Sequence, residues 1–152
     1  MPLPDFDFET GLIKKGYKAI AGVDEVGRGC IAGPVTAAAV ILNPQKIPSG
    51  LNDSKKVNFK NREKIFQSIQ DTCTFCVAHS SVEEIDQINI LQASLLSMKR
   101  AILGLNIKPD FVLIDGNKSP GGLESESETI TKGDSKSLSI AAASIVAKVT
   151  RD

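Results

Sequence analysis

The sequence has few cysteines, no net charge and no long hydrophobic run. Its 152 residues include three cysteines, and its 18 basic side chains balance 18 acidic ones. Three cysteines without a secretory signal indicate a reducing compartment, so we expect a cytoplasmic protein. No apolar stretch reaches the ~18 residues that cross a membrane as a helix. The acidic, proline-containing residues 1–11 are unlike a signal or transit peptide.

Internal repeats, low-complexity tracts and linkers are also missing. We therefore expect a single domain of residues 1–152, in which residues 1–17 form a lead-in. The neutral charge balance argues mildly against a nucleic-acid binder, which is usually basic on one face. That objection weakens if several acids gather in a metal site, because the remaining surface is then net basic.

The hydrophobic spacing predicts an α/β fold. Strands are expected at 18–24, 35–42, 73–79, 111–114 and 129–132. Helices are expected at 8–14, 59–71, 82–103 and 139–152. The first three strands should form an antiparallel meander. The fourth strand follows a long helical crossover and should lie parallel to the first.

Acidic side chains stand at the ends of two of these strands. Asp24 and Glu25 follow the apolar run 19–23, and Asp115 follows the run 111–114. If the two strands are parallel, both end at the edge where open α/β sheets bind ligands. Adjacent buried carboxylates repel each other, and a divalent cation relieves the repulsion because Mg²⁺ prefers carboxylate oxygens. We expect a metal site there, although an Asp-Gly pair is by itself typical of a turn.

Asp134 is a fourth candidate acid. It precedes the last predicted helix by a few residues, so helix capping is the simpler interpretation. As a metal ligand it would complete a four-carboxylate cluster able to hold two cations. Two cations ~3.5–4 Å apart can activate the attacking oxygen and stabilise the leaving oxygen when a phosphodiester is cleaved.

Two polar segments are candidates for phosphate binding. In Gly27-Arg28-Gly29 the glycines allow close backbone approach, and the guanidinium fits a phosphate. Residues 27–32 also match the dinucleotide-binding pattern G-x-G-x-x-A, but a strand follows them instead of the required helix. Lys55 and Lys56 either bind phosphate as point charges or belong to a solvated turn.

Cys73, Cys76 and His79 have a spacing that suggests zinc. On a strand, however, Cys76 would point away from the other two, and no second cysteine pair completes a tetrahedral site. We expect these three residues to be structural. A phospho-accepting receiver domain also pairs two acids after its first strand. Its acceptor aspartate should end a strand much nearer to that pair than Asp115 does.

Five segments follow one another along the chain. They are Gly22–Gly29 (GVDEVGRG), Leu51–Lys56 (LNDSKK), Glu84–Leu91 (EIDQINIL), Leu113–Asn117 (LIDGN) and Lys132–Asp152 (KGDSKSLSIAAASIVAKVTRD). Together they resemble ribonuclease HII, the type 2 ribonuclease H of bacteria. The resemblance implies a ribonuclease H-like fold, with a mixed five-stranded sheet flanked by helices. It also implies Mn²⁺- or Mg²⁺-dependent cleavage of the RNA strand of RNA–DNA hybrids and incision at single ribonucleotides in duplex DNA, leaving 5′-phosphate and 3′-hydroxyl ends.

The resemblance assigns roles to the candidate residues. Those that match its catalytic, metal-binding acids are Asp24, Glu25, Asp115 and Asp134. Those that match the turn reading the ribose 2′-hydroxyl are Gly27, Arg28 and Gly29. Lys55 and Lys56 match a loop near the substrate backbone.

The resemblance also describes what this sequence lacks. Members of the family extend further at the C-terminal end and carry there a tyrosine that stacks near the DNA–RNA junction. Tyr17 is the one tyrosine here and precedes the first strand. We expect a monomer, with the C-terminal part of the family domain absent, that acts on RNA–DNA hybrids and ribonucleotide-containing duplex DNA. A shortened hybrid-binding module with impaired cleavage is the alternative.

Overall fold

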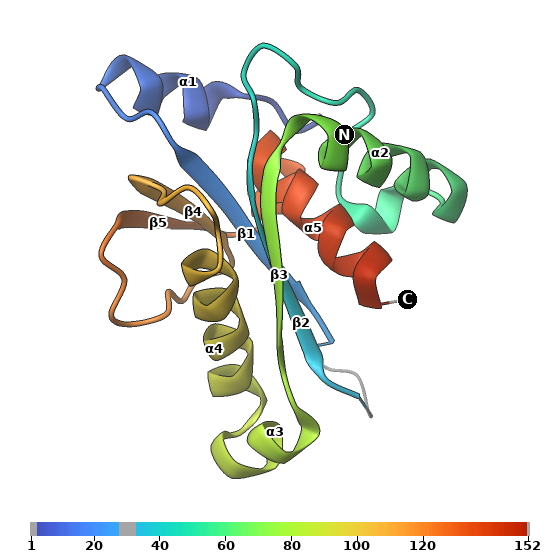
Figure 1. Ribbon diagram of the computed structural model, residues 1–152, viewed down its shortest axis with the longest axis vertical. Coiled ribbons are helices and arrows are strands. Elements are labelled where there is room, and N and C mark those ends of the chain that lie inside the picture. The colour runs from blue at the N-terminus through green and yellow to red at the C-terminus, as the bar shows by residue number, and fades with distance from the viewer. Residues whose placement is uncertain (1–2, 28–32, 152) are drawn as a thin grey trace.

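A mixed five-stranded sheet organises the computed structural model, which describes residues 3–27 and 33–151 (Figure 1). The strands are β1 Ile20–Val26, β2 Val35–Ile41, β3 Thr74–Ser80, β4 Phe111–Asp115 and β5 Glu126–Ile130. Their order across the sheet is β3-β2-β1-β4-β5. β2 runs antiparallel to β1 and β3, whereas β4 runs parallel to β1 and β5. The predicted meander and the predicted parallel pair of β1 and β4 are both confirmed.

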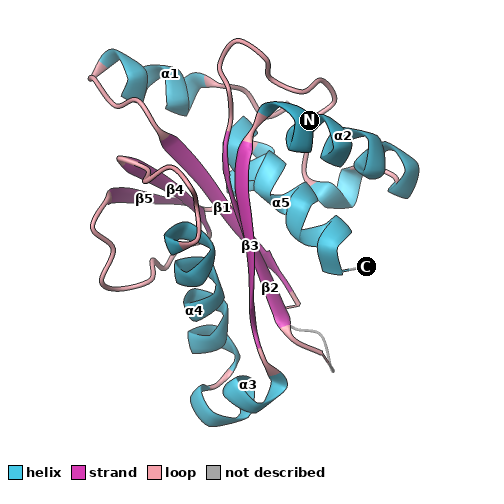
Figure 2. Ribbon diagram, in the orientation of Figure 1, coloured by secondary structure: helices cyan, strands magenta, loops and turns pink. Residues whose placement is uncertain are grey.

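Helices cover both faces of this sheet (Figure 2). They are α1 Asp7–Lys14, α2 Phe59–Thr72, α3 Val82–Ile88, α4 Ile90–Leu103 and α5 Leu138–Arg151, with 3₁₀ turns η1 Ser54–Lys56 and η2 Gly133–Ser135. Side chains of a strand alternate between the two faces. Ala38 and Val40 of β2 therefore pack in the cluster with α2 and α5, whereas Ala37 and Ala39 pack in the cluster with α4.

Helix α5 is the central helix of the fold, and it lies directly against β1. Every residue from Ser139 to Ala147 is buried. A Cβ atom added at Gly22 would stand 2.2 Å from the carbonyl carbon of Ser139, so only glycine permits this approach. This contact places the start of α5 against Gly22, which precedes Asp24 by two residues in β1.

The prediction of one helix over 82–103 is wrong, because Asn89 interrupts the helix. Asn89 has a φ of 73° and separates α3 from α4. Asparagine adopts positive φ more readily than most residues, and its side chain here accepts a hydrogen bond from the backbone N–H of Gln92. The apolar spacing continues across the break and therefore conceals it.

Strand boundaries also differ from the prediction by a few residues, notably at the end of β1 and the start of β5. β1 continues through Asp24 and Glu25, whose Cα partners on β2 are Ala38 and Ala37. The predicted strand 18–24 already includes Asp24, and the observed strand continues past Glu25 to Val26. β5 begins at Glu126 instead of 129. The prediction misses the first residues of this strand because they are exposed and polar and carry no apolar pattern. Within the described ranges, no helix is long and apolar enough to span a membrane.

Candidate metal centre

Three carboxylates meet at the edge where the parallel strands end. Asp24, Asp115 and Asp134 offer oxygen atoms that all lie within 4.8 Å of one another. Asp24 and Asp115 each follow the paired residues Val23 and Ile114 of neighbouring strands. Asp134 comes from η2, the turn that follows β5. The convergence of Asp24 and Asp115 is the one expected from parallel strands, and η2 adds the third acid.

Asp24 is the most enclosed of the three, with 4% of its surface exposed. Burial raises the pKa of its carboxyl well above the usual range, and the charges of Asp115, Asp134 and Glu25 raise it further. One hydrogen bond opposes this, from the backbone N–H of Glu25 to Asp24 Oδ1 at 2.8 Å. A cation bound among these oxygens would remove the repulsion, so the donor set fits a divalent metal such as Mg²⁺ or Mn²⁺.

Asp134 shares this environment and has a further acidic neighbour. Burial, the charge of Asp115, and the charge and side-chain hydrogen bond of Asp53 raise the pKa of Asp134 to about 6, although Lys55 opposes the shift. Its backbone N–H donates to Asp115 Oδ1 at 3.3 Å. Ser137, not Asp134, accepts the bond that caps α5. The capping interpretation of Asp134 is therefore not supported.

The acids line a cleft of about 390 Å³. Its walls are Asp24, Glu25, Val26, Gly27, Ser54, Lys55, Asp115, Asp134, Ser144 and Lys148. Glu25 thus faces the same cleft, although the group of mutually close ligand atoms has three members among the described residues. The cleft combines one buried and two half-buried aspartates with the ammonium groups of two lysines.

Of the other predicted site residues, some line the cleft and others do not. Gly27 lines the cleft with a φ of 104°, and a Cβ there would stand 2.9 Å from the carbonyl oxygen of Pro34. Arg28 and Gly29 lie outside the described residues. Lys55 lines the cleft, whereas Lys56 lines a separate hollow beside Asn58 at the start of α2.

Comparisons with known proteins identify the family of the chain. The family model described as Ribonuclease HII matches residues 21–152. The chain belongs to the ribonuclease HII family. Ribonuclease HII of Ruegeria pomeroyi is 55% identical over 152 residues, which are 100% of this chain and 65% of that protein. Ribonuclease HII of Agrobacterium fabrum is 56% identical over 149 residues, covering 98% of this chain and 69% of that protein. The chain thus spans about two thirds of the length of these curated relatives.

Solved structures confirm the ribonuclease H-like fold. Ribonuclease H2 from Pyrococcus horikoshii superposes with a TM-score of 0.76 at 31% identity, covering 89% of this chain and 72% of that one. The Mn²⁺ complex of Bst-RNase HIII gives a TM-score of 0.74 at 22% identity, over 87% of this chain and 51% of that one. The second likeness concerns the fold alone.

Three residues that line the cleft of this ribonuclease HII family member are not predicted from the sequence: Ser54, Ser144 and Lys148. Ser144 Oγ donates to Ser54 Oγ at 2.8 Å, and both serines are buried. This pair joins the turn that carries Lys55 to helix α5. Lys148 stands one helical turn after Ser144 and also faces the cleft. Their i, i+4 spacing was the available signal, but the small and apolar residues around them give α5 the pattern of a core helix.

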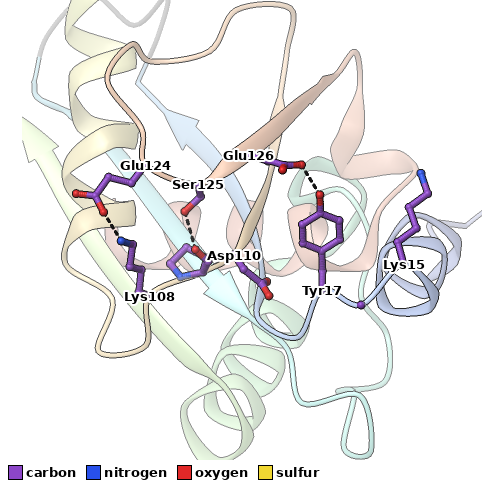
Figure 3. A pocket seen from close by; sticks show the side chains of 9 residues that line it. Lys15, Tyr17, Lys108, Asp110, Glu124, Ser125 and Glu126 are labelled. Atoms are coloured by element: carbon purple, nitrogen blue, oxygen red, sulfur yellow. Dashed lines mark hydrogen bonds and ion pairs between the residues drawn. The ribbon is translucent and has the colours of Figure 1, made fainter.

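A larger cavity of about 550 Å³ lies at the opposite edge of the sheet (Figure 3). It is lined by residues just before β1 and β4 and by residues at the start of β5, where the parallel strands begin. Its polar groups bind one another: Tyr17 donates to Glu126, and Lys108 pairs with Glu124. The third carboxylate of this cavity, Asp110, accepts from the backbone N–H groups of Lys18 and Ala19. The cleft with Asp24, Asp115 and Asp134 therefore fits the chemistry of the ribonuclease HII family better.

Among the residues that the structure describes, Cys73, Cys76 and His79 do not assemble a zinc site. Cys73 packs with the cluster on the α2 and α5 side, whereas Cys76 packs with the cluster on the α4 side. His79 Nδ1 shares a hydrogen bond of 3.0 Å with the hydroxyl of Thr36. Cys76 therefore points away from Cys73, as the sequence predicts.

Proposed function

We propose that this protein is a metal-dependent endonuclease that cleaves the RNA strand of RNA–DNA hybrids. The observation that carries the proposal is the cluster of Asp24, Asp115 and Asp134 within 4.8 Å, with Asp24 almost completely buried. Uncompensated charges in such a cluster are costly, so the arrangement is typical of a site for a divalent cation. Membership of the ribonuclease HII family supports the same function.

The three clustered aspartates would hold the metal, and Glu25 would bind from the rim of the cleft. Mn²⁺ or Mg²⁺ bound there would supply activation of a water molecule and stabilisation of the leaving oxygen. The protein's own contribution is positioning. β1 and β4 fix two of the acids on a rigid sheet, and η2 brings the third.

The remaining residues of the cleft would bind the nucleic acid. Lys55 and Lys148 stand beside the acids and would neutralise backbone phosphates. Gly27 permits close backbone approach, and with Arg28 and Gly29 it would contact the ribose 2′-hydroxyl, which distinguishes RNA from DNA. Lys56 would meet the substrate backbone outside the cleft.

We further propose incision at single ribonucleotides in duplex DNA, with 5′-phosphate and 3′-hydroxyl products, by a monomer in the cytoplasm. The test offers the protein three labelled duplexes with Mn²⁺ or Mg²⁺: an RNA–DNA hybrid, a DNA duplex with one ribonucleotide, and an all-DNA duplex. We expect cleavage of the first two, none of the third, and none in EDTA.

Variants make this assay specific to the cluster. Asp24→Asn and Asp115→Asn should abolish cleavage, whereas Asp86→Asn, at an exposed position on α3, should leave it unchanged. Binding of the hybrid without cleavage in either metal would favour a hybrid-binding module instead. Neither binding nor cleavage would contradict both functions.

A further inference from the structure

Glu9 is a carboxylate in the interior of the protein that the proposed function does not use. It lies on α1, in the segment that sequence reasoning treats as a lead-in, and its surface is 0% exposed. Its Oε2 accepts two hydrogen bonds, from the hydroxyl of Ser137 and from the backbone N–H of Ser139, both at 2.9 Å. Its Oε1 has no hydrogen-bond partner among the described residues. Burying a carboxylate is costly, so the burial of Glu9 beside these two donors indicates a structural or functional role.

The two donors lie at the start of α5. Ser137 directly precedes the helix, and Ser139 belongs to its first turn, whose N–H groups have no partner within the helix. Each of these groups finds a partner elsewhere. The N–H of Ser139 binds Glu9, and that of Leu138 binds the carbonyl oxygen of Asp5 at 3.0 Å. The N–H of Ile140 binds Ser137 Oγ at 3.2 Å. The N-terminal segment thus supplies two of the acceptors that complete the start of α5.

The same first turn is continuous with the turn that carries Asp134. Ser137 follows Asp134 by three residues, and its N–H donates to the carbonyl oxygen of Gly133 at 2.8 Å. Ser137 therefore binds Glu9 through its hydroxyl and η2 through its backbone. Asp5 also pairs with Ser137 in an isolated parallel β-bridge. The N-terminal segment therefore contacts Ser137 through both Asp5 and Glu9.

Glu9 is well suited to hold this junction. A negative charge at the N-terminal end of a helix is favoured by the helix dipole, and a hydrogen bond to a charged group is stronger than a neutral one. The hydroxyl of Ser137 donates to Glu9 while accepting from Ile140, so the three groups form one chain of hydrogen bonds. Loss of the carboxylate would leave the Ser139 N–H buried and unpaired.

We propose that Glu9 is a positioning residue for Asp134: by binding Ser137 and Ser139 it fixes the start of α5 and, through it, the turn that presents Asp134 to the metal. The proposal rests on the proposed role of Asp134 as a metal ligand. Glu9 is not one of the residues that line the cleft. It acts through a contact between residues 128 positions apart in the sequence.

The test compares Glu9→Met, which keeps the length of the side chain but removes both acceptors, with Glu9→Gln, which keeps one acceptor oxygen. Two quantities are measured on the full chain: amide hydrogen exchange over residues 133–141, and the dissociation constant for Mn²⁺ by calorimetry. We expect Glu9→Met to exchange faster over 133–137 and to bind Mn²⁺ ~10-fold more weakly, as is usual when a residue behind a metal ligand is removed. Glu9→Gln should recover most of both properties.

Leu12→Ala is the matched control, because Leu12 is a buried residue of the same helix that packs in an apolar cluster with Ile20 and Phe111. It should lower the melting temperature and leave the Mn²⁺ affinity unchanged. Unchanged exchange over 133–137 in Glu9→Met, or equal loss of Mn²⁺ affinity in Leu12→Ala, would overturn the proposal. If the wild type itself bound no Mn²⁺, the proposed function would fail, and the exchange rates would still decide whether Glu9 fixes the turn.

Discussion

Asp24 and Asp115 reach the same point in space from two neighbouring parallel strands, although 91 positions separate them in the sequence. The pairing of Val23 with Ile114 sets this meeting, since each acid is the next residue of its strand. The strands cannot slip by one residue without moving every side chain to the other face. The distance between the two carboxylates is therefore a property of the sheet.

Gly22→Ala is expected to be strongly destabilising. The added Cβ would stand 2.2 Å from the carbonyl carbon of Ser139, so α5 would have to move away from β1. Overpacking of this kind costs ~1–3 kcal/mol or more, which urea unfolding can measure. Gly11→Ala on α1 is the control, because a Cβ added there would meet nothing within 4 Å and alanine favours a helix. Equal stability of Gly22→Ala and the wild type would contradict the close approach of α5.

Ser144→Ala should weaken both the fold and substrate binding. It leaves the hydroxyl of Ser54 without its 2.8 Å partner in a buried position, at a cost of ~1–3 kcal/mol. The turn that carries Lys55 then loses its link to α5, and the KM for the hybrid should rise. Ser94→Ala is the matched control, since Ser94 Oγ is buried and has no hydrogen-bond partner in the described structure. Similar losses in both variants would show that the Ser54 contact has no special role.

The stability of the metal-free protein should fall as the pH rises. The folded state raises the pKa of Asp134 to about 6 and that of Asp24 well above its usual range. Between the ordinary aspartate pKa and these values the folded state binds more protons than the unfolded state, so stability is lost as the pH rises through that window. Arg100 lowers the pKa of Glu84 to about 2, so the contribution of Glu84 to stability changes only at more acidic pH than this window.

Melting temperatures measured between about pH 5 and pH 8 test this linkage. In EDTA the melting temperature should drop across the window, and saturating Mg²⁺ should remove most of the drop. Asp24→Asn should flatten the curve in EDTA. A metal-free protein that became more stable with rising pH, or Mg²⁺ that stabilised equally at both ends of the window, would argue against the carboxylate cluster.

Substitutions at Asn89 test the break between α3 and α4. Asn89→Ala should cost ~1–2 kcal/mol, because alanine is strained at a φ of 73° and cannot accept the bond from Gln92. Asn89→Gly should cost less, since glycine tolerates this conformation and loses only the cap. Thermal unfolding of the two variants measures the difference. Both variants lose the cap, so an alanine variant as stable as the glycine variant would contradict the positive φ of Asn89.

Sequence patterns predict those features that depend on neighbouring residues. The apolar runs before Asp24 and Asp115 identify two buried strands, and the helical crossover between them makes the strands parallel, which is enough to bring the two acids together. The break at Asn89 is not predicted, because the apolar spacing runs on through it. The start of β5 at Glu126 is not predicted either, because an exposed edge strand has no apolar side.

Other features depend on contacts between distant parts of the chain. Glu9 has the appearance of an ordinary surface acid of a helix, and its burial arises only when α1 meets the start of α5. Asp53 and Ser54 belong to a polar loop in the sequence, and their neighbours Asp134 and Ser144 come from a turn and a helix far along the chain. No local pattern contains this information.

The central claim is that Asp24, Asp115 and Asp134 form one metal centre, and anomalous diffraction from a crystal soaked in Mn²⁺ tests it most directly. The account predicts an anomalous peak bonded to the carboxylates of these three residues, with Glu25 beside it, and the loss of that peak in Asp115→Asn. An anomalous map with no peak between these carboxylates at saturating Mn²⁺ would contradict it.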